Sequence, residues 1–164
     1  MKANGMMKRT LVAGFVLAAG LSASAFEWRT HVSNALVEAK AKDRPLLLFF
    51  TGSDWCGWCQ LLNKEVFDTE AFEDYANSSL VSVMLDFPQK TRLPAEQVEQ
   101  NERLAKRYEV RGFPTIHLFS PDGEWIGQLG YQPGGPEAFI KSINQEQARF
   151  RLRRKVNEQM PRLE

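Results

Sequence analysis

The two cysteines of this 164-residue chain are the residues best able to do chemistry. They are separated by two residues in the segment Trp55-Cys56-Gly57-Trp58-Cys59, which follows an apolar run and precedes a helical pattern. At the first turn of a helix, free N–H groups and the helix dipole favour an anion, so Cys56 should ionise more readily than an ordinary thiol. A thiolate attacks disulfides, and Cys59 is close enough to displace the disulfide that Cys56 then forms. The spacing predicts a two-electron redox centre, with Cys56 exposed and Cys59 one turn further in.

Two other uses of such a cysteine pair fit less well. A structural disulfide across so short a loop adds little stability, because the stabilisation grows with loop length. A structural zinc site needs four ligands, and this pair supplies two. The only histidines in the sequence, His31 and His117, lack the paired spacing that would complete such a site. We therefore favour redox chemistry and expect no metal.

A buried scaffold must position the cysteines. Residues 46–50 form a continuous apolar run, which is typical of a strand buried on both faces of a sheet that helices cover. Around this strand, periodicity and turn residues predict, in chain order, a helix over 30–42, the strand itself, a helix from Cys56, a short helix over 70–76, a strand over 81–86, a helix over 95–108, a strand over 116–119, a turn at 120–123, a strand over 125–129 and a last helix after Pro136. Residues 87–100 have the composition of an insertion.

Helical spacing of the apolar residues predicts which faces enter the core. The expected buried residues are Val32, Ala35, Leu36 and Ala39 in the first helix, Leu61, Leu62 and Val66 after the cysteines, Val98, Leu104, Ala105 and Tyr108 in the helix over 95–108, and Phe139, Ile140, Ile143 and Phe150 in the last helix. His117 lies inside a predicted strand, so we expect a packed, hydrogen-bonded residue there rather than a catalyst.

Residues 1–25 have the pattern of a cleavable secretory signal peptide. Lys2, Lys8 and Arg9 precede an apolar stretch over 11–21, and Ala23-Ser24-Ala25 matches the small-residue cleavage pattern. A membrane anchor is the alternative, but a spanning helix needs roughly 20 apolar residues. Export would place the cysteine pair in an extracytoplasmic compartment, where its chemistry concerns protein disulfides.

Charge is distributed unevenly along the chain. Residues 26–148 hold 12 basic and 18 acidic residues, whereas residues 149–164 hold six basic and two acidic ones. An acidic body argues against a nucleic-acid-binding function, which needs a basic face. The basic end has apolar residues every four positions, so a helix is expected there. We favour a plain extension of the last helix over a contact with anionic lipid or an acidic partner.

Three linked features of the sequence resemble the thioredoxin family. They are the Trp55–Cys59 motif after a buried strand, Gly112-Phe113-Pro114-Thr115 before the next long strand, and the Asp122-Gly123 hairpin turn. The resemblance covers roughly residues 27–147 and implies an α/β thioredoxin fold, in which helices flank a central mixed β-sheet. Together with the leader pattern and the basic end, it divides the chain into a signal peptide (1–25), a thioredoxin-like domain (26–147) with an insertion after Asp86, and a basic helical tail (148–164).

A narrower resemblance concerns small periplasmic members of this family that act as reductases. It is carried by residues 50–56, by Asp86-Phe87-Pro88-Gln89-Lys90, and by residues 130–135. The insertion after Asp86 fits this subgroup and departs from cytoplasmic thioredoxin.

The family resemblance implies roles for individual residues. Cys56 would be the nucleophile, Cys59 the resolving thiol, and Pro114 a cis-proline facing the two sulfurs; an ordinary trans proline at a strand start is the alternative. The implied substrate contacts are Trp55, Gly57, Trp58 and Phe113, with the Phe113 backbone free to pair with an extended polypeptide.

One departure from the family concerns the proton of Cys59. Cytoplasmic thioredoxins bury an aspartate in the strand before the motif, where this chain has only apolar residues. Asp86 and Glu65 are candidate proton acceptors through water, although we favour surface or turn roles for both. Asp54 is expected to face solvent.

The sequence thus predicts a periplasmic thiol–disulfide oxidoreductase, in the reductase direction, without metal or organic cofactor. Its expected partners are disulfide-containing or misoxidised exported proteins and a membrane electron donor of the DsbD type. The alternatives are an oxidase or isomerase, or a non-catalytic module that binds clients.

Overall fold

The apolar strand ahead of the cysteines is β1 (Leu46–Thr51), and all six of its residues are buried. In the computed structural model, which describes residues 26–160, β1 lies inside a four-stranded sheet of order β2-β1-β3-β4. It pairs in parallel with β2 (Val81–Asp86) and antiparallel with β3 (Thr115–Phe119), which forms a hairpin with β4 (Trp125–Leu129). The predicted signal peptide, residues 1–25, lies outside the described residues.

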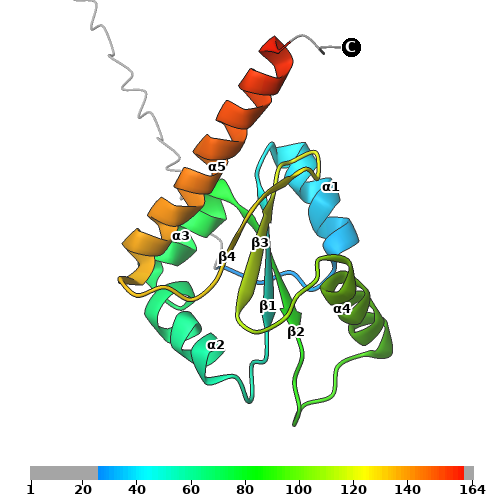
Figure 1. Cartoon of the computed structure of the whole chain (residues 1–164). Coiled ribbons are helices and arrows are strands. Elements are labelled where there is room, and N and C mark those ends of the chain that lie inside the picture. Colours follow the sequence, from blue (N-terminus) through cyan, green and yellow to red (C-terminus); the bar gives the residue numbers. More distant parts are fainter. Residues whose placement is uncertain (1–25, 161–164) are drawn as a thin grey trace, which may run out of the picture.

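The helices confirm the predicted order. In chain order they are α1 (Val32–Lys42), α2 (Gly57–Leu62), the π-helical turn η1 (Asn63–Phe67), α3 (Glu70–Ser79), α4 (Ala95–Arg107) and α5 (Gly135–Gln159). Figure 1 shows them arranged on both sides of the sheet. The expected thioredoxin fold, with a mixed sheet, a segment inserted after Asp86 and a C-terminal helix, is confirmed.

Alternation along β1 builds two cores at once. Leu47 and Phe49 face a cluster formed with α2, α3 and α5, whereas Leu46, Leu48 and Phe50 face a second cluster formed with α1 and α4. Successive side chains of a strand point to opposite faces, so a continuous apolar run supplies both clusters. The redox cysteines belong to the first cluster.

Two residues that were predicted to be buried lie at the surface. Leu36 of α1 is 36% exposed and Val98 of α4 is 39% exposed, while the other predicted core residues are buried or half-buried. In α4, Gln100 and Asn101 are buried instead. Gln100 accepts the N–H of the first residue of α1 at 2.9 Å, and Asn101 donates to the carbonyl at the end of β2 at 2.9 Å. Counting apolar residues misses these positions, because their burial depends on partners far away in the sequence.

Helix α5 continues into the basic end of the chain without a break and reaches Gln159. Phe139 and Ile143 anchor its first part in the core, and Arg153 donates to the carbonyl of Ile126 in β4 at 2.8 Å. The expected extension of the last helix is therefore confirmed for these residues (Figure 1). No helix within residues 26–160 is both long and apolar enough to cross a membrane.

A tight turn joins β1 to the redox helix. In this turn the carbonyl of Gly52 accepts a hydrogen bond from the backbone N–H of Cys56 at 2.8 Å. The indole ring of Trp55 packs directly against Gly52. A Cβ atom at Gly52 would lie 2.5 Å from the Trp55 ring. Only glycine allows so close an approach, so Gly52 is needed for the position of Trp55.

His117 of β3 is a packed residue, as predicted. It is 4% exposed, lies against the rings of Phe50 and Tyr108, and accepts the indole N–H of Trp125 on Nδ1 at 3.2 Å. Its Nε2 atom is buried without a hydrogen-bond partner among the described residues. Burial lowers the pKa of His117, because the charged imidazolium would lose its hydration there.

We expect Gly52→Ala to lower the free energy of unfolding by about 1–3 kcal/mol, because the added methyl group must displace the Trp55 ring. Urea denaturation of the oxidised protein measures the change. Gly112→Ala is the matched control, since a Cβ atom there meets nothing within 4 Å. If both variants are as stable as the parent protein, the contact between Gly52 and Trp55 does not constrain the turn.

Acid should destabilise the fold through His117. The pKa of His117 is lower in the folded state than in the unfolded chain. Its contribution to the free energy of unfolding is therefore fully present above about pH 6.5. As the pH falls below about 6.5, the free energy of unfolding declines, by up to about 1.4 kcal/mol per pH unit. The His117→Phe variant should show a smaller loss of stability between pH 7.5 and 5.5 in urea titrations. A hydrogen bond from Arg29 lowers the pKa of Glu38 to about 2, so that carboxylate titrates well below this window. An unchanged pH slope in the variant would show that the imidazole is not the responsible group.

Candidate active site

The two cysteines are joined by a disulfide where β1 turns into α2. Cys56 is the N-cap of α2 and Cys59 lies in its first turn, with their Cα atoms 5.3 Å apart. Cys59 is fully buried. Cys56 is only 7% exposed, which corrects the expectation of an exposed nucleophile. Both sulfurs belong to the same apolar cluster as Leu62 and Phe139, so substrate can reach only a small edge of Cys56.

The electrostatic position of Cys56 favours a thiolate once the disulfide is reduced. Its sulfur accepts the backbone N–H of Cys59 at 3.2 Å, which is the capping interaction at the start of α2. An N–H group aimed at sulfur stabilises the negative form more than the neutral thiol. Cys59 has no exposed surface, and this burial disfavours its own ionisation.

The predicted cis-proline is present at the same end of the sheet. The Phe113–Pro114 peptide bond is cis. Thr115, which follows it, pairs with Phe50 near the end of β1, so the proline loop borders the start of the redox motif. The backbone of Gly130 passes beside the Pro114 carbonyl, where a Cβ atom would lie 3.6 Å from the oxygen.

Aromatic side chains surround this end of the molecule. Trp55 is 43% exposed and packs edge-on against Phe113, with ring centroids 5.8 Å apart. Trp58 is 60% exposed and lies 5.1 Å from the ring of Tyr131. Gly57, between the cysteines, has open space around it. The structure therefore brings Trp55 and Phe113 together and places Trp58 against a different partner, Tyr131.

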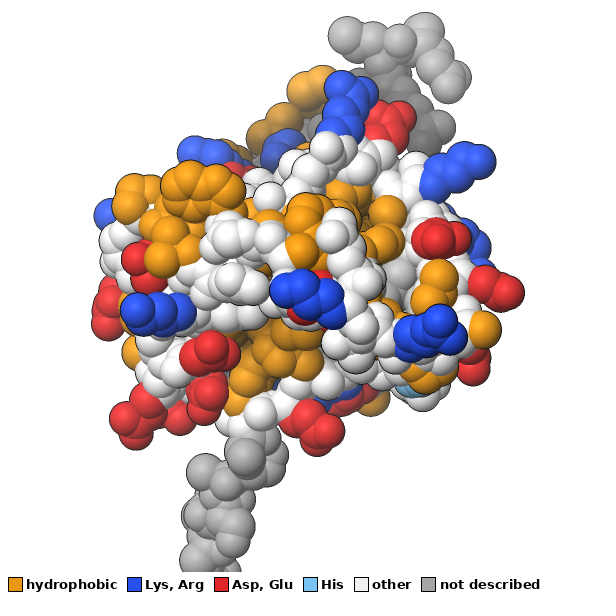
Figure 2. All heavy atoms as spheres, turned by 90° about the horizontal axis from the view of Figure 1, so that it is seen from below, with side chains coloured by type: hydrophobic (Ala, Val, Ile, Leu, Met, Phe, Trp, Pro, Cys, Tyr) orange, Lys and Arg blue, Asp and Glu red, His pale blue; other side chains and the backbone are white. Residues whose placement is uncertain are grey.

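The surface at this end mixes apolar and charged groups. Figure 2 views the molecule from the end where β1 leads into α2 and shows hydrophobic side chains gathered in separate patches between acidic and basic ones. Such a surface can contact an extended polypeptide through apolar side chains. On this face of the described residues, basic and acidic side chains are interspersed.

The two candidate proton acceptors for Cys59 are engaged elsewhere. Glu65 accepts the hydroxyl of Tyr131 at 2.8 Å, and this hydrogen bond raises the pKa of Tyr131. Asp86 accepts the backbone N–H of Ser53 at 2.9 Å and its hydroxyl at 2.6 Å. The hydrogen bonds recorded for these two carboxylates within residues 26–160 thus go to Tyr131 and Ser53.

Asp54 is not simply a solvent-facing residue. Its carboxylate accepts backbone N–H groups from Gln89, Lys90 and Thr91 at 2.9, 2.7 and 3.1 Å. These bonds, led by that from Gln89, lower the pKa of Asp54 because they stabilise its charged form. Sequence reasoning missed this contact because Asp54 and its partners are 35–37 positions apart.

Sequence reasoning also missed Phe87 and Tyr131 as parts of the site. Phe87 stacks on Phe113 with centroids 5.1 Å apart, and its backbone carbonyl accepts the indole N–H of Trp55 at 2.8 Å. Both residues lie in the segments that carry the narrower family resemblance, and this was the only sequence signal for them.

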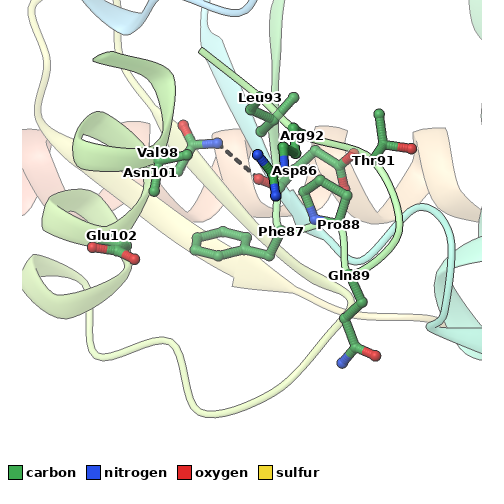
Figure 3. A pocket seen from close by; sticks show the side chains of 10 residues that line it. All are labelled: Asp86, Phe87, Pro88, Gln89, Thr91, Arg92, Leu93, Val98, Asn101 and Glu102. Atoms are coloured by element: carbon green, nitrogen blue, oxygen red, sulfur yellow. Dashed lines mark hydrogen bonds between the residues drawn. The ribbon is translucent and has the colours of Figure 1, made fainter. Parts of the chain in front are cut away.

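A cavity of about 400 Å³ opens between residues 86–93 and α4 (Figure 3).

No ligand set for a metal was found in the described part of the chain. Within residues 26–160, no group of three or more His, Cys, Asp or Glu side chains lies close enough together to hold an ion.

Comparison with known proteins agrees with this geometry. A model of the thioredoxin-like domain family matches residues 32–147. The disulfide bond reductase DsbH of Chlamydia pneumoniae is 34% identical over 123 residues, which cover 75% of this chain and 74% of that protein.

Solved structures give the same result. A structure described as DsbH oxidoreductase superposes with a TM-score of 0.70 at 31% identity, covering 85% of this chain and 94% of that one. A thioredoxin from Thermus thermophilus, with a TM-score of 0.56 and 24% identity, shares the fold. Because the family match spans most of the chain and the DsbH likeness holds in both sequence and structure, the chain belongs to the thioredoxin-like domain family and is a DsbH-like thiol–disulfide oxidoreductase.

Proposed function

We propose that this protein is a periplasmic disulfide reductase that acts on exported proteins through Cys56 and Cys59. The observation that carries the proposal is the placement of this pair: one sulfur caps a helix and keeps a small exposed edge, while the other is fully buried. A pair so arranged has one sulfur open to attack a substrate and a second that only the first can reach. The relative named as a disulfide bond reductase supports the direction.

The exchange would proceed in two steps. The Cys56 thiolate attacks one sulfur of a substrate disulfide, forming a mixed disulfide and releasing the other substrate sulfur as a thiolate. Cys59 then loses its proton and attacks the Cys56 sulfur, which frees the second substrate thiol. The substrate gains two electrons and two protons, and the protein is left as the Cys56–Cys59 disulfide.

The polypeptide around the substrate disulfide would be held by the aromatic side chains and by the proline loop. Trp55, Gly57 and Trp58 present exposed surface beside the sulfurs. None of the hydrogen bonds recorded across residues 26–160 involves the Phe113 backbone, which is therefore available to pair with an extended segment, as in strand addition. Pro114 thus acts with the two cysteines, while Phe113 acts through its backbone.

Periplasmic location rests on the signal-peptide pattern of residues 1–25. A reductase outside the cytoplasm has no access to cytoplasmic reductants, so its disulfide must be reduced across the membrane. We therefore propose a membrane electron donor of the DsbD type as the partner that regenerates the dithiol. The favoured substrates are exported proteins whose disulfides are wrong or unwanted.

The cysteines should have separable roles. Cys56→Ser should reduce the rate of insulin disulfide reduction to background, because the attacking sulfur is lost. Cys59→Ser should retain the attack and accumulate mixed disulfides, which gel electrophoresis without reductant detects. Thermal unfolding of each variant checks that the fold survives. If Cys56→Ser keeps the parent protein's function in cells, the chain is a client-binding module and not an exchange enzyme.

The reduction potential of the pair decides the direction of exchange. Equilibration with a dithiothreitol or glutathione redox buffer should give a value near that of thioredoxin, about −270 mV, because a reductase must hold its electrons weakly. A value near that of the oxidant DsbA, about −120 mV, would mean that the protein donates disulfides, and the reductase assignment would be wrong.

A further inference from the structure

Three consecutive residues before the nucleophile are each hydrogen-bonded to residues 86–91, which comprise the last residue of β2 and the segment that follows it. Ser53 donates its N–H and its hydroxyl to Asp86. Asp54 accepts the N–H groups of residues 89–91, and Trp55 donates its indole N–H to the Phe87 carbonyl. The 86–91 segment is therefore joined to the redox motif by every residue from Ser53 to Trp55.

The backbone of residues 88–93 depends on Asp54 for its order. The segment contains Pro88 and forms no helix or strand. Across residues 26–160, the three bonds to the Asp54 carboxylate are the only hydrogen bonds recorded for the backbone of residues 88–93. Figure 3 shows that the other side of the segment faces α4 across an open cavity, so packing on that side is incomplete.

The same segment also holds the second half of the site. The ring of Phe87 stacks on Phe113 with planes 29° apart, directly before the cis-proline. Its carbonyl holds the Trp55 indole, and the Trp55 and Phe113 rings touch each other. One residue, Phe87, therefore sets the orientation of aromatic groups from both the redox motif and the proline loop.

We propose that Asp54 is a positioning residue for disulfide exchange: it holds residues 89–91, and through them the Phe87 carbonyl, so that Trp55 and Phe113 are oriented to receive a polypeptide substrate. The proposal rests on the proposed function and adds a determinant of specificity to it. A polypeptide that reaches Cys56 must also contact the aromatic side chains, whereas a small disulfide needs only the exposed edge of the sulfur. Asp54 therefore favours protein disulfides over small ones.

The test compares two substrates. In Asp54→Ala, the KM for insulin should rise about fivefold or more, the size typical for truncation of a contact that matters at an interface. Its kcat for insulin, its rate with oxidised glutathione and the reduction potential of its cysteines should stay within about twofold of the parent values. Asp54→Asn keeps the shape of the side chain and one acceptor oxygen, and should give a smaller rise in KM.

Asp122→Asn is the matched control. Asp122 is also a loop carboxylate, 66% exposed in its side chain and 3.6 Å from Lys40, but it lies in the hairpin turn at the other end of β1. It should leave all of these rates unchanged. The proposal is overturned if Asp54→Ala slows the reduction of insulin and of oxidised glutathione equally. It is also overturned if the variant slows neither reaction.

A double-mutant cycle tests the route through Trp55. Trp55→Phe keeps an aromatic ring but cannot donate to the Phe87 carbonyl, so on this background Asp54→Ala should raise the KM for insulin by less than about twofold. An undiminished rise would show that Asp54 does not act through Trp55.

A readout independent of turnover separates this proposal from the proposed function. Exchange of the Trp55 indole N–H with solvent, followed by NMR, should be faster in Asp54→Ala and in Asp54→Asn than in the parent protein. Equal exchange rates would overturn the positioning role even in an active enzyme. If the parent protein reduces neither insulin nor glutathione, the proposed function fails, while the indole exchange still decides whether Asp54 positions Trp55.

Discussion

The complete burial of β1 is the constraint on which the rest of the structure depends. Its side chains fill two separate cores, one on each face of the sheet. A shift of one residue would exchange the two faces, so the register of β1 against β2 and β3 is strongly determined. The position of the end of β1 is therefore fixed, and this determines where residues 52–56, which follow directly, start.

The two redox cysteines lie within a single helical turn and are both buried, Cys59 completely and Cys56 to 7% exposure. Cys56 caps α2 at the edge of the apolar cluster, whereas Cys59 faces into it. The strand beneath contributes only apolar side chains from Leu46 to Phe50, so the local environment of the sulfurs is set by packing and by backbone N–H groups. The carboxylates nearest in sequence, on Asp54 and Glu65, are hydrogen-bonded to other groups.

Polar side chains do more to join the elements of this fold than its apolar pattern suggests. Asn101 of α4 binds the carbonyl of Asp86, and the carboxylate of Asp86 binds Ser53 before the redox motif. The carboxylate of the next residue, Asp54, accepts hydrogen bonds from the backbone N–H groups of residues 89–91. These contacts link α4, the end of β2 and the start of α2 in a continuous chain of hydrogen bonds. The residues inserted after Asp86 are thus part of the site's architecture.

Much of this protein could be predicted from the sequence alone. The continuous run over 46–50 predicted a doubly buried strand, and the spacing of Cys56 and Cys59 predicted a redox pair at a helix start, because both signals are local and periodic. The resemblance to the thioredoxin family implied a cis-proline at Pro114, and the order of elements together with that resemblance predicted the fold. The tertiary structure decided what depends on distant partners: the near-burial of Cys56, the exposure of Val98, the buried amides of Gln100 and Asn101, and the contacts of Asp54. A side chain's periodicity records which way it points along its own element, but its hydrogen-bond partner is set by the segment that folding brings opposite to it.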